Sequence, residues 1–393
     1  MVNILFVIDS LCSGGAEKSL VNLLNEIDYK KYNVDLQLFS HNNFLLDLLP
    51  ENVNVLPLPV YFQECKSSLI NLLMKKKIRL FLVRLRTSFF IRIKNKKKKH
   101  IIQTQWECIK NSIESSTKQY DVAIAYSQGM PTYYVKEKIS SHKKIAWINC
   151  LYSNTRYNKK KDQKYYKTFT ELVVVSEKSK EDFLTVFPEF ANKVNVIYDF
   201  ISKKIVEEKA NEFFEWEDDF QGVRITSILR LEWVKGPDII LECCKKMKSM
   251  NIDFKWYLIG GEGSMSSTIR EGIKECNLSE NLILLGPQIN PFKFVKNSDI
   301  YVQASRIEGY CMALAEAKML DIGIVSTDFL LVSEHIENEV NGCICTTNSQ
   351  DMLEKILHMV NDREFRERTI LNRKKDNKNY NHELEKFYQM IGC

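Results

Sequence analysis

The sequence of 393 residues contains no run of about 20 apolar residues, so it predicts no helix that spans a membrane. It begins without the basic stretch and small-residue cleavage site of a secretory signal, and Val2 to Ile8 is typical of a buried strand. Its eleven cysteines include no Cys-x-x-Cys pair, and no histidine falls at zinc-finger spacing. We therefore expect reduced thiols, no structural zinc and a cytoplasmic location.

Several nucleotide and metal motifs are also missing. There is no Walker loop, and Gly260-Gly261-Glu262-Gly263 lacks the third glycine of a dinucleotide fingerprint because position 266 is Ser. No Asp-x-Asp triplet is present to hold a divalent cation on a diphosphate. The sequence therefore predicts no metal and no cofactor.

Acidic residues are absent from one long segment. Between Lys66 and Lys99 there are nine Lys, four Arg and no Asp or Glu, so the rest of the chain carries −7 against a total of +6. The segment is also rich in Leu, Ile and Phe, a composition typical of a surface that lies on an anionic membrane. A partly buried helix pair followed by a solvated loop would have the same composition. Nucleic-acid binding is not expected, because no recognisable module with interleaved aromatics appears.

Strands that alternate with helical stretches favour parallel sheets covered on both faces. In the first half, strands are predicted at 2–8, 33–39, 53–56, 120–126, 144–148, 172–175 and 194–197. In the second half, they are predicted at 224–229, 254–259, 282–285, 300–304 and 323–327. The two halves follow one α/β plan, and a ligand of such a plan binds at the carboxyl ends of the strands.

Changes in composition predict the domain boundaries. A first domain is expected over 1–198, with the basic insert at 66–100, and a second over 222–375. The polar and irregular segment 199–221 is the expected hinge. Residues 376–393 are expected to form a helix that packs back on the first domain.

Two carboxylates eight residues apart, Glu308 and Glu316, form the most informative pattern of the chain. The spacing predicts a helix that starts at Glu308, with the two acids roughly 80° apart around it and about two turns apart along it. N–H groups at a helix start attract phosphate, and carboxylates accept hydrogen bonds from sugar hydroxyls. The pattern therefore favours a ligand that is part phosphate and part sugar.

Two cations and a glycine pair follow other predicted strands. Arg230 and Lys235 stand just before Gly236, where they can pair with a diphosphate, although isolated surface charge has the same appearance. Gly14 and Gly15 open a helix after the first strand and let backbone N–H groups approach a phosphate, although such pairs are common in tight turns.

Together these stretches resemble the donor half of family-four retaining glycosyltransferases, whose fold is GT-B. The resemblance is strong over about 222–345 and looser in the first half. It rests on Ile228 to Gly236, Leu258 to Gly263, Leu284 to Gly286, Ser305 to Tyr310 with Glu316-Ala317, and, more loosely, Gly14 to Glu17 and Tyr120 to Val122. It implies an α/β protein with two facing Rossmann-like domains, each built on a parallel sheet, and a cleft between them.

The resemblance also implies residue roles. Arg230 and Lys235 would hold the donor diphosphate, Glu308 would contact the transferred sugar, and Glu316 would accept from the ribose hydroxyls. The remaining expected substrate-binding residues are Gly309, Tyr310 and Cys311 near the sugar and phosphate, Gly286, Pro287 and Gln288 along the base, and Gly14 and Gly15 over the phosphate.

The first half departs from the family pattern at three positions. Relatives often carry His where this chain has Asn149, and an amide cannot exchange a proton at neutral pH. Gln128 stands where relatives often have Glu, and Asp199 where they often have Asn. Asn149 is still able to hydrogen-bond a sugar hydroxyl.

The sequence thus predicts a retaining, metal-independent hexosyltransferase. We expect the donor to be a nucleotide diphosphate sugar linked to UDP, and the acceptor to be a glycan or lipid-linked hydroxyl in bacterial surface polysaccharide synthesis. The basic segment 66–100 would hold the enzyme at the inner face of the cell membrane. The alternatives are a nucleotide-sugar epimerase, a phosphorylase that would need pyridoxal phosphate, and a degenerate sugar-binding protein.

Overall fold

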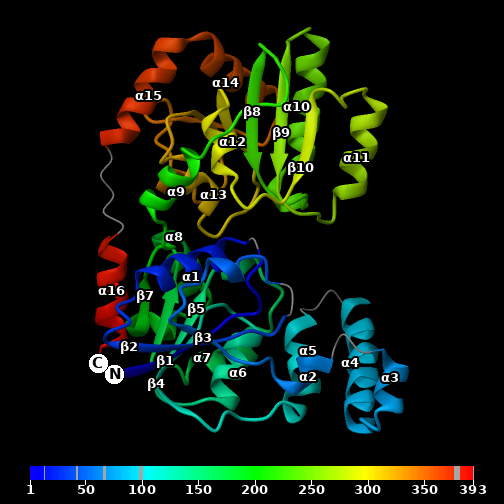
Figure 1. Cartoon of the computed structure of the whole chain (residues 1–393), viewed down its shortest axis with the longest axis vertical. Coiled ribbons are helices and arrows are strands. Elements are labelled where there is room, and N and C mark those ends of the chain that lie inside the picture. The colour runs from blue at the N-terminus through cyan, green and yellow to red at the C-terminus, as the bar shows by residue number, and fades with distance from the viewer. Residues whose placement is uncertain (13, 41–42, 65–67, 97–100, 376–380, 393) are drawn as a thin grey trace. The chain divides into compact units, whose positions relative to one another are not determined.

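The computed structural model describes the chain except for residues 13, 41–42, 65–67, 97–100, 376–380 and 393. The chain forms two compact α/β units (Figure 1). The first comprises Met1–Phe200 together with Asn381–Cys393, and the second comprises Ile201–Tyr380.

The first unit is built on a parallel sheet of seven strands in the order β3-β2-β1-β4-β5-β6-β7. Its strands are β1 (Val2–Val7), β2 (Tyr32–Gln37), β3 (Val53–Val55), β4 (Gln119–Ala125), β5 (Ser140–Ile148), β6 (Glu171–Val174) and β7 (Val194–Val196). Its helices are α1 (Gly15–Glu26), α2 (Val60–Gln63), α3 (Leu69–Met74), α4 (Ile78–Lys96), α5 (Ile101–Ile109), α6 (Met130–Lys138), α7 (Lys159–Tyr166), α8 (Glu177–Val186) and α16 (Asn381–Ile391). The strand order reverses between β1 and β4.

The second unit repeats the plan with six parallel strands in the order β10-β9-β8-β11-β12-β13. Its strands are β8 (Val223–Ile228), β9 (Phe254–Ile259), β10 (Leu282–Gly286), β11 (Ile300–Gln303), β12 (Gly323–Thr327) and β13 (Cys343–Cys345). Its helices are α9 (Lys203–Ala210), α10 (Pro237–Ser249), α11 (Ser266–Glu275), α12 (Phe292–Lys296), α13 (Met312–Ala317), α14 (Ser349–Asn361) and α15 (Arg363–Lys375). Here the order reverses between β8 and β11.

Apolar strands explain why both sheets are covered by helices on their two faces (Figure 1). The central strands β1 and β4 end in continuous buried runs, Ile4 to Val7 and Val122 to Ala125. Strands of a parallel sheet have this composition because helices cover both faces and leave no side for water. The expectation of two domains built on parallel sheets is therefore confirmed.

Two local predictions differ from the structure. The short edge strand β13 was not expected, and it pairs with β12 through Cys343 and Cys345. The segment 199–221 is not irregular throughout, because α9 occupies Lys203–Ala210 and Asn290 Nδ2 donates to Lys209 O at 2.7 Å. A hinge role for this segment stays a prediction.

The last helix, α16, packs on the first unit although it follows the second along the chain. Phe387 is fully buried, with its ring centroid 6.1 Å from that of Phe6 and 6.3 Å from that of Phe200. Tyr388 stacks on Tyr32 with centroids 5.5 Å apart. The C-terminal residues therefore complete the core of the first unit.

Candidate active site

The loops that carry the predicted donor-site residues meet at one edge of the second sheet. All pairs of neighbouring strands in this sheet are parallel, so the loops after β8, β9, β10 and β11 leave from the same edge. The strand order reverses between β8 and β11, and in open α/β sheets ligands bind at the carboxyl edge beside such a reversal.

Gly236 holds the loop after β8 against the end of β11. It adopts φ +68°, and a Cβ at this position would lie 2.0 Å from Ala304 O. Only glycine allows that approach of two backbones. A short 3₁₀ turn, Trp233–Lys235, precedes it, and Pro237 follows as the first residue of α10. Lys235 is thereby fixed beside the loop that begins at Ser305.

Lys235 and Glu308 form an ion pair across the reversal point. Lys235 Nζ donates to Glu308 Oε2 at 2.6 Å, while Ser305 Oγ donates to Oε1 at 2.6 Å. Gln303 Nε2 lies 2.8 Å from Ser305 Oγ and 3.4 Å from Glu308 Oε1. Glu308 is buried, and these donors fix the orientation of its carboxylate.

Glu308 is not part of a helix, which corrects the prediction from the eight-residue spacing. The helix α13 begins only at Met312, and Cys311 before it adopts a left-handed φ of +69°. Glu308 therefore lies in the loop that precedes the helix, whereas Glu316 lies on the helix and is buried. The helical geometry predicted for the pair is wrong.

The two acids are nevertheless brought to the same place. The phenol of Tyr301 is fully buried, and burial raises its pKa well above the ordinary value, with further contributions from Cys311, Glu316 and Glu308. Burial likewise raises the pKa of the Cys311 thiol, which Glu308 raises further and Lys235 lowers. Lys235, Glu308, Cys311 and Glu316 thus form one electrostatic group.

Arg230 lies at the same edge but in the open. It follows β8, its side chain is exposed, and Gly261 would contact its Cγ only if it carried a Cβ. In the part of the chain that the structure describes, its guanidinium has no hydrogen bond or ion pair. It is therefore an accessible cation beside the paired Lys235.

Gly286, Pro287 and Gln288 lie at the end of β10, two strands from Arg230. Gly260 N donates to Gly286 O at 3.0 Å, which joins this loop to the glycine-rich end of β9. Gln288 Nε2 donates to Leu285 O at 2.9 Å. The structure therefore places the expected base-binding loop on the same edge as the cations.

Gly14, Gly15 and Asn149 lie in the first unit, at the carboxyl edge of its own sheet. Gly14 precedes α1, which begins at Gly15 as predicted. Asn149 follows β5, where its N–H donates to Gln128 Oε1 at 3.0 Å and its Nδ2 donates to Tyr126 O at 2.7 Å. Its Oδ1 has no hydrogen-bond partner among the described residues, so this amide offers an acceptor to a ligand.

Two buried carboxyls of this edge were not recognised as site residues. Ser127 Oγ donates to Asp9 Oδ2 at 3.3 Å across the reversal between β1 and β4, and burial raises the pKa of Asp9 to about 7. Burial also raises the pKa of Asp199 to about 7, with Ser19 beside it. Asp9 could have been recognised from the sequence, because it is a polar residue that follows a buried strand.

Comparison with known proteins gives a family match within the second unit. Residues 208–376 match the model of the family described as "Glycosyl transferases group 1". The second unit is therefore similar to this family. Its match agrees with the resemblance to GT-B glycosyltransferases in the sequence.

Two similar bacterial proteins are named as transferases of N-acetylated sugars. The N-acetylgalactosamine-N,N'-diacetylbacillosaminyl-diphospho-undecaprenol 4-alpha-N-acetylgalactosaminyltransferase of Campylobacter jejuni is 26% identical over 50% of this chain and 52% of its own. The poly(ribitol-phosphate) alpha-N-acetylglucosaminyltransferase of Staphylococcus aureus is 30% identical over 36% of this chain and 29% of its own. The chain thus spans about half, or less, of the length of the curated relatives it matches.

A solved structure shares the fold over the whole chain. HepE of Anabaena, solved with UDP and glucose, has a TM-score of 0.72 at 15% identity and covers 100% of this chain and 99% of its own. At this identity the likeness establishes the fold alone. The shared fold therefore includes both units and the C-terminal helix.

The basic insert carries an exposed row of apolar side chains on α4, called the apolar stripe below. Residues spaced by three or four along α4 share one face and are exposed by 37 to 61%: Ile78, Leu82, Leu85, Phe89 and Ile93. Leu80, Val83 and Thr87 lie on the opposite face, where the first two pack against the core of the first unit. The helix is apolar on both faces for this reason. The end of the insert at Lys97–Lys99 lies outside the described residues.

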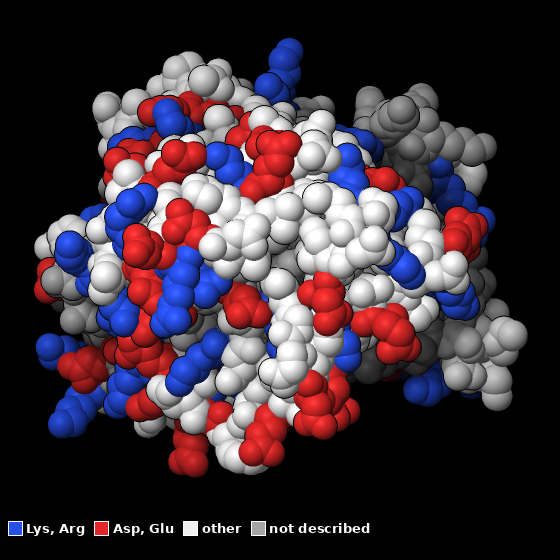
Figure 2. All heavy atoms as spheres, turned by 90° about the horizontal axis from the view of Figure 1, so that it is seen from above, with Lys and Arg blue, Asp and Glu red and all other residues white. Residues whose placement is uncertain are grey.

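Charges elsewhere are mixed. On the face seen in Figure 2, Lys and Arg are interspersed with Asp and Glu, and no continuous positive surface covers it. Surface cations of the second unit pair with acids, as Lys355 does with Glu339 at 2.8 Å and Lys374 with Asp321 at 2.7 Å. No described helix is both long enough and apolar enough to cross a bilayer.

Proposed function

We propose that this protein is a retaining glycosyltransferase of family four that transfers a hexosyl unit from a UDP-sugar to a hydroxyl of a lipid-linked or glycan acceptor in surface polysaccharide synthesis. The Lys235–Glu308 pair, beside the accessible Arg230 at the reversal point of the second sheet, carries this proposal. The names of the Campylobacter and Staphylococcus relatives support the acceptor class, and the UDP bound to HepE supports the donor.

The two cations stabilise the leaving diphosphate. As the bond to the anomeric carbon breaks, negative charge grows on the diphosphate oxygens. Arg230 supplies a planar guanidinium group and Lys235 a compact ammonium charge. Both lie at the carboxyl edge of the second sheet before the reaction begins. No metal is needed in this scheme, since fixed cations take the role.

Glu308 orients the sugar and is not a nucleophile. Both of its oxygens accept hydrogen bonds, from Lys235 and from Ser305, so neither is free to attack carbon. The diphosphate draws Lys235 toward itself, and the freed carboxylate oxygen accepts from a sugar hydroxyl. Retention then follows the family's scheme, in which the acceptor attacks from the face of the leaving diphosphate and a diphosphate oxygen takes its proton.

Glu316 and Asn149 complete the substrate contacts. Glu316 accepts from the ribose hydroxyls, and Asn149 offers Oδ1 to a sugar hydroxyl. The free acceptor on Asn149 argues against a degenerate protein, because a buried carbonyl oxygen without a partner costs stability unless a ligand satisfies it.

The apolar stripe of α4 holds the enzyme on the cytoplasmic membrane surface. Arg79 and Arg86 lie on the same helix as the five exposed apolar side chains, so that the stripe would enter the lipid boundary while the cations contact anionic head groups. A lipid-linked acceptor would reach the enzyme in this position.

Thermal-shift titration with UDP-, GDP- and ADP-sugars tests the donor assignment. A UDP-sugar is expected to raise the Tm of the wild type and not that of Lys235→Ala. Release of UDP should then require an acceptor glycan, whereas an epimerase would convert the donor without one. A Tm that responds equally in Lys235→Ala contradicts the proposed site.

A further inference from the structure

A cavity of about 450 Å³ lies within the first unit, where the insert meets the body of the domain. Residues of α4, α5, α7 and the loop before α7 line it, among them Arg86, Phe90, Gln103, Arg156, Tyr157 and Lys161. None of these residues belongs to the donor site described above.

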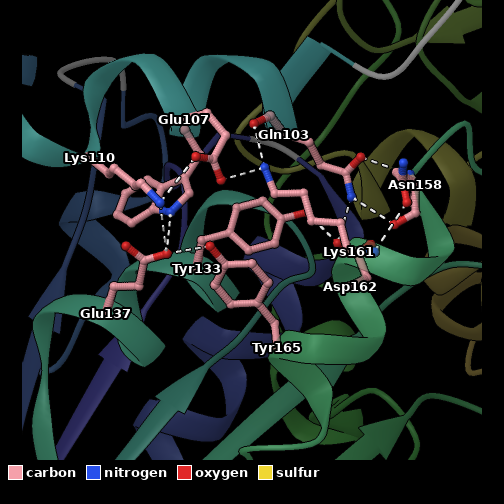
Figure 3. Close-up of polar contacts among 10 residues, drawn as sticks. Gln103, Glu107, Lys110, Tyr133, Glu137, Asn158, Lys161, Asp162 and Tyr165 are labelled. Carbon is pink, nitrogen blue, oxygen red and sulfur yellow. Dashed lines mark hydrogen bonds and ion pairs between the residues drawn. The ribbon is translucent and has the colours of Figure 1, made fainter.

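The wall of the cavity is rigid. Gln103 Nε2 donates to Asp162 Oδ1 at 2.6 Å, and Asn158 N donates to Gln103 Oε1 at 2.7 Å (Figure 3). Asp162 is buried and also accepts from Tyr133 Oη at 2.7 Å and Tyr152 Oη at 2.6 Å. These bonds tie α7 to α5 and hold the cavity open.

The charge of the cavity is positive and only partly compensated. Lys161 pairs with Glu107 at 2.7 Å and donates to Gln103 O at 3.1 Å (Figure 3). Glu107 is the one carboxylate in the lining. Among the described residues, the guanidinium groups of Arg86 and Arg156 have no ion-pair partner. Two uncommitted guanidinium forks favour a phosphate with at least two negative charges.

The cavity joins two features that point to a lipid. Phe90 and Arg86 belong to α4, and the Arg86 guanidinium lies 5.7 Å from the Phe90 ring centroid, beside the exposed apolar stripe. On the other side, Tyr157 reaches the carboxyl edge of the sheet, because a Cβ on Gly129 would lie 2.7 Å from its hydroxyl. The cavity therefore lies between the apolar stripe and the edge that carries Asn149.

We infer that this cavity binds the diphosphate head of an isoprenoid-type lipid, with Arg86 and Arg156 on the diphosphate and the chain along the apolar stripe of α4. The inference rests on the proposed lipid-linked acceptor and names the residues that hold its phosphates. The volume suits a diphosphate with the first part of a chain, and the remaining chain leaves over Phe90. A sugar attached to the diphosphate would extend past Tyr157 toward Asn149.

Calorimetric titration with farnesyl diphosphate tests the inference. The full chain is used with Lys235→Ala, so that the donor site does not take up the diphosphate. Arg86→Ala and Arg156→Ala on this background should each weaken binding by about tenfold or more, as loss of a charged hydrogen bond predicts. Thr104→Trp, which fills the cavity without changing its charge, should abolish binding.

Arg92→Ala is the matched control, because Arg92 lies on α4 but does not line the cavity. It should change the affinity less than twofold. Equal losses for Arg92→Ala and Arg86→Ala, or unchanged affinity in Arg86→Ala and Arg156→Ala, would overturn the inference. Farnesol and inorganic diphosphate should each bind at least tenfold more weakly than farnesyl diphosphate, and equal binding of inorganic diphosphate would show a plain anion site.

The outcome is separable from the proposed function. If UDP fails to bind the wild type while farnesyl diphosphate binds through Arg86 and Arg156, the transferase proposal is wrong and the cavity assignment stands. If UDP binds and the cavity variants titrate like the parent, the cavity assignment alone is wrong.

Discussion

The ammonium group of Lys235 lies 2.6 Å from the carboxylate of Glu308, although 73 residues separate them in the chain. The pair bridges the loops after β8 and β11, the two strands between which the order of the sheet reverses. This cation neutralises a buried acid, and in the proposed function it also contacts the donor diphosphate.

Removal of the Lys235 ammonium group should lower both the reaction rate and the stability of the fold. We expect Lys235→Ala to lower kcat by about 10²- to 10³-fold, because it removes a charge that stabilises the leaving group. It should also destabilise the fold by about 1–3 kcal/mol, because Glu308 keeps only its neutral donors. Initial rates and urea unfolding measure the two effects.

A second substitution distinguishes the two effects. Glu308→Gln on the Lys235→Ala background should restore the lost stability, because no buried charge remains, while the rate stays low. Lys374→Ala, which breaks the exposed pair with Asp321, is the control and should leave both quantities near wild type. Full activity in Lys235→Ala contradicts the assignment.

The glycines of the donor edge should differ in their tolerance of alanine. Gly236 and Gly286 both adopt φ +68°, but a Cβ would meet Ala304 O at 2.0 Å in the first case and nothing within 4 Å in the second. Gly286→Ala should therefore cost only the backbone term, about 1–2 kcal/mol. Gly236→Ala should cost at least twice as much. Equal midpoints in urea would show that the two backbones do not approach as described.

Asp199 should make stability fall as pH rises from 5 to 8. Burial raises its pKa to about 7 in the folded protein, with Ser19 and Tyr126 beside it. Over this range the folded state holds a proton that the unfolded chain has released, and above the folded pKa this advantage is gone. Up to ~4 kcal/mol is at stake for a carboxyl shifted that far.

Asp199→Asn tests this origin of the pH dependence. We expect it to raise the Tm by about 5 °C or more at pH 8 and to change it little at pH 5. Asp47→Asn, at an exposed carboxyl of the same unit, should have no such effect. A uniform Tm shift at both pH values would rule out titration of Asp199 as the cause.

The apolar stripe should govern membrane association. Leu82→Ser with Phe89→Ser should reduce co-sedimentation with vesicles of phosphatidylcholine and 30 mol% phosphatidylglycerol by about tenfold or more, because each removes apolar area that enters the lipid boundary. Leu371→Ser, an equally exposed leucine on α15, is the control. If it lowers binding as much, the stripe has no special role.

Strands and helix starts were predictable where one pattern dominates locally. A few residues were enough to predict β1 and β4 from their buried runs, and the start of α1 from its glycines. The three-residue strand β13 could not be predicted, since Cys-Ile-Cys is too short to show a period. The helix α9 was not predicted, because its surface is largely polar and the sequence does not reveal its contacts with α12.

The sequence predicted candidate site residues but not their geometry. Arg230, Lys235 and Glu308 lie at one edge of the second sheet, and their role in a site stays a prediction. The left-handed turn at Cys311 places the start of the helix after Glu308, which the spacing of the two acids could not show. The stripe on α4 was hidden for a different reason. Both faces of α4 are apolar, so a helical wheel shows no single apolar face. The exposed face can be recognised only when the packing against the core of the first unit is known.

The position of α16 has a consequence for how the protein is made. Phe387 fills the space between Phe6 and Phe200, yet it is translated after nearly all of the second unit. The first unit emerges from the ribosome before α16 is translated, and until then its apolar surface around Phe6 and Phe200 is exposed. Deletion of Asn381–Cys393 should therefore expose the first unit to aggregation and leave the second unit folded.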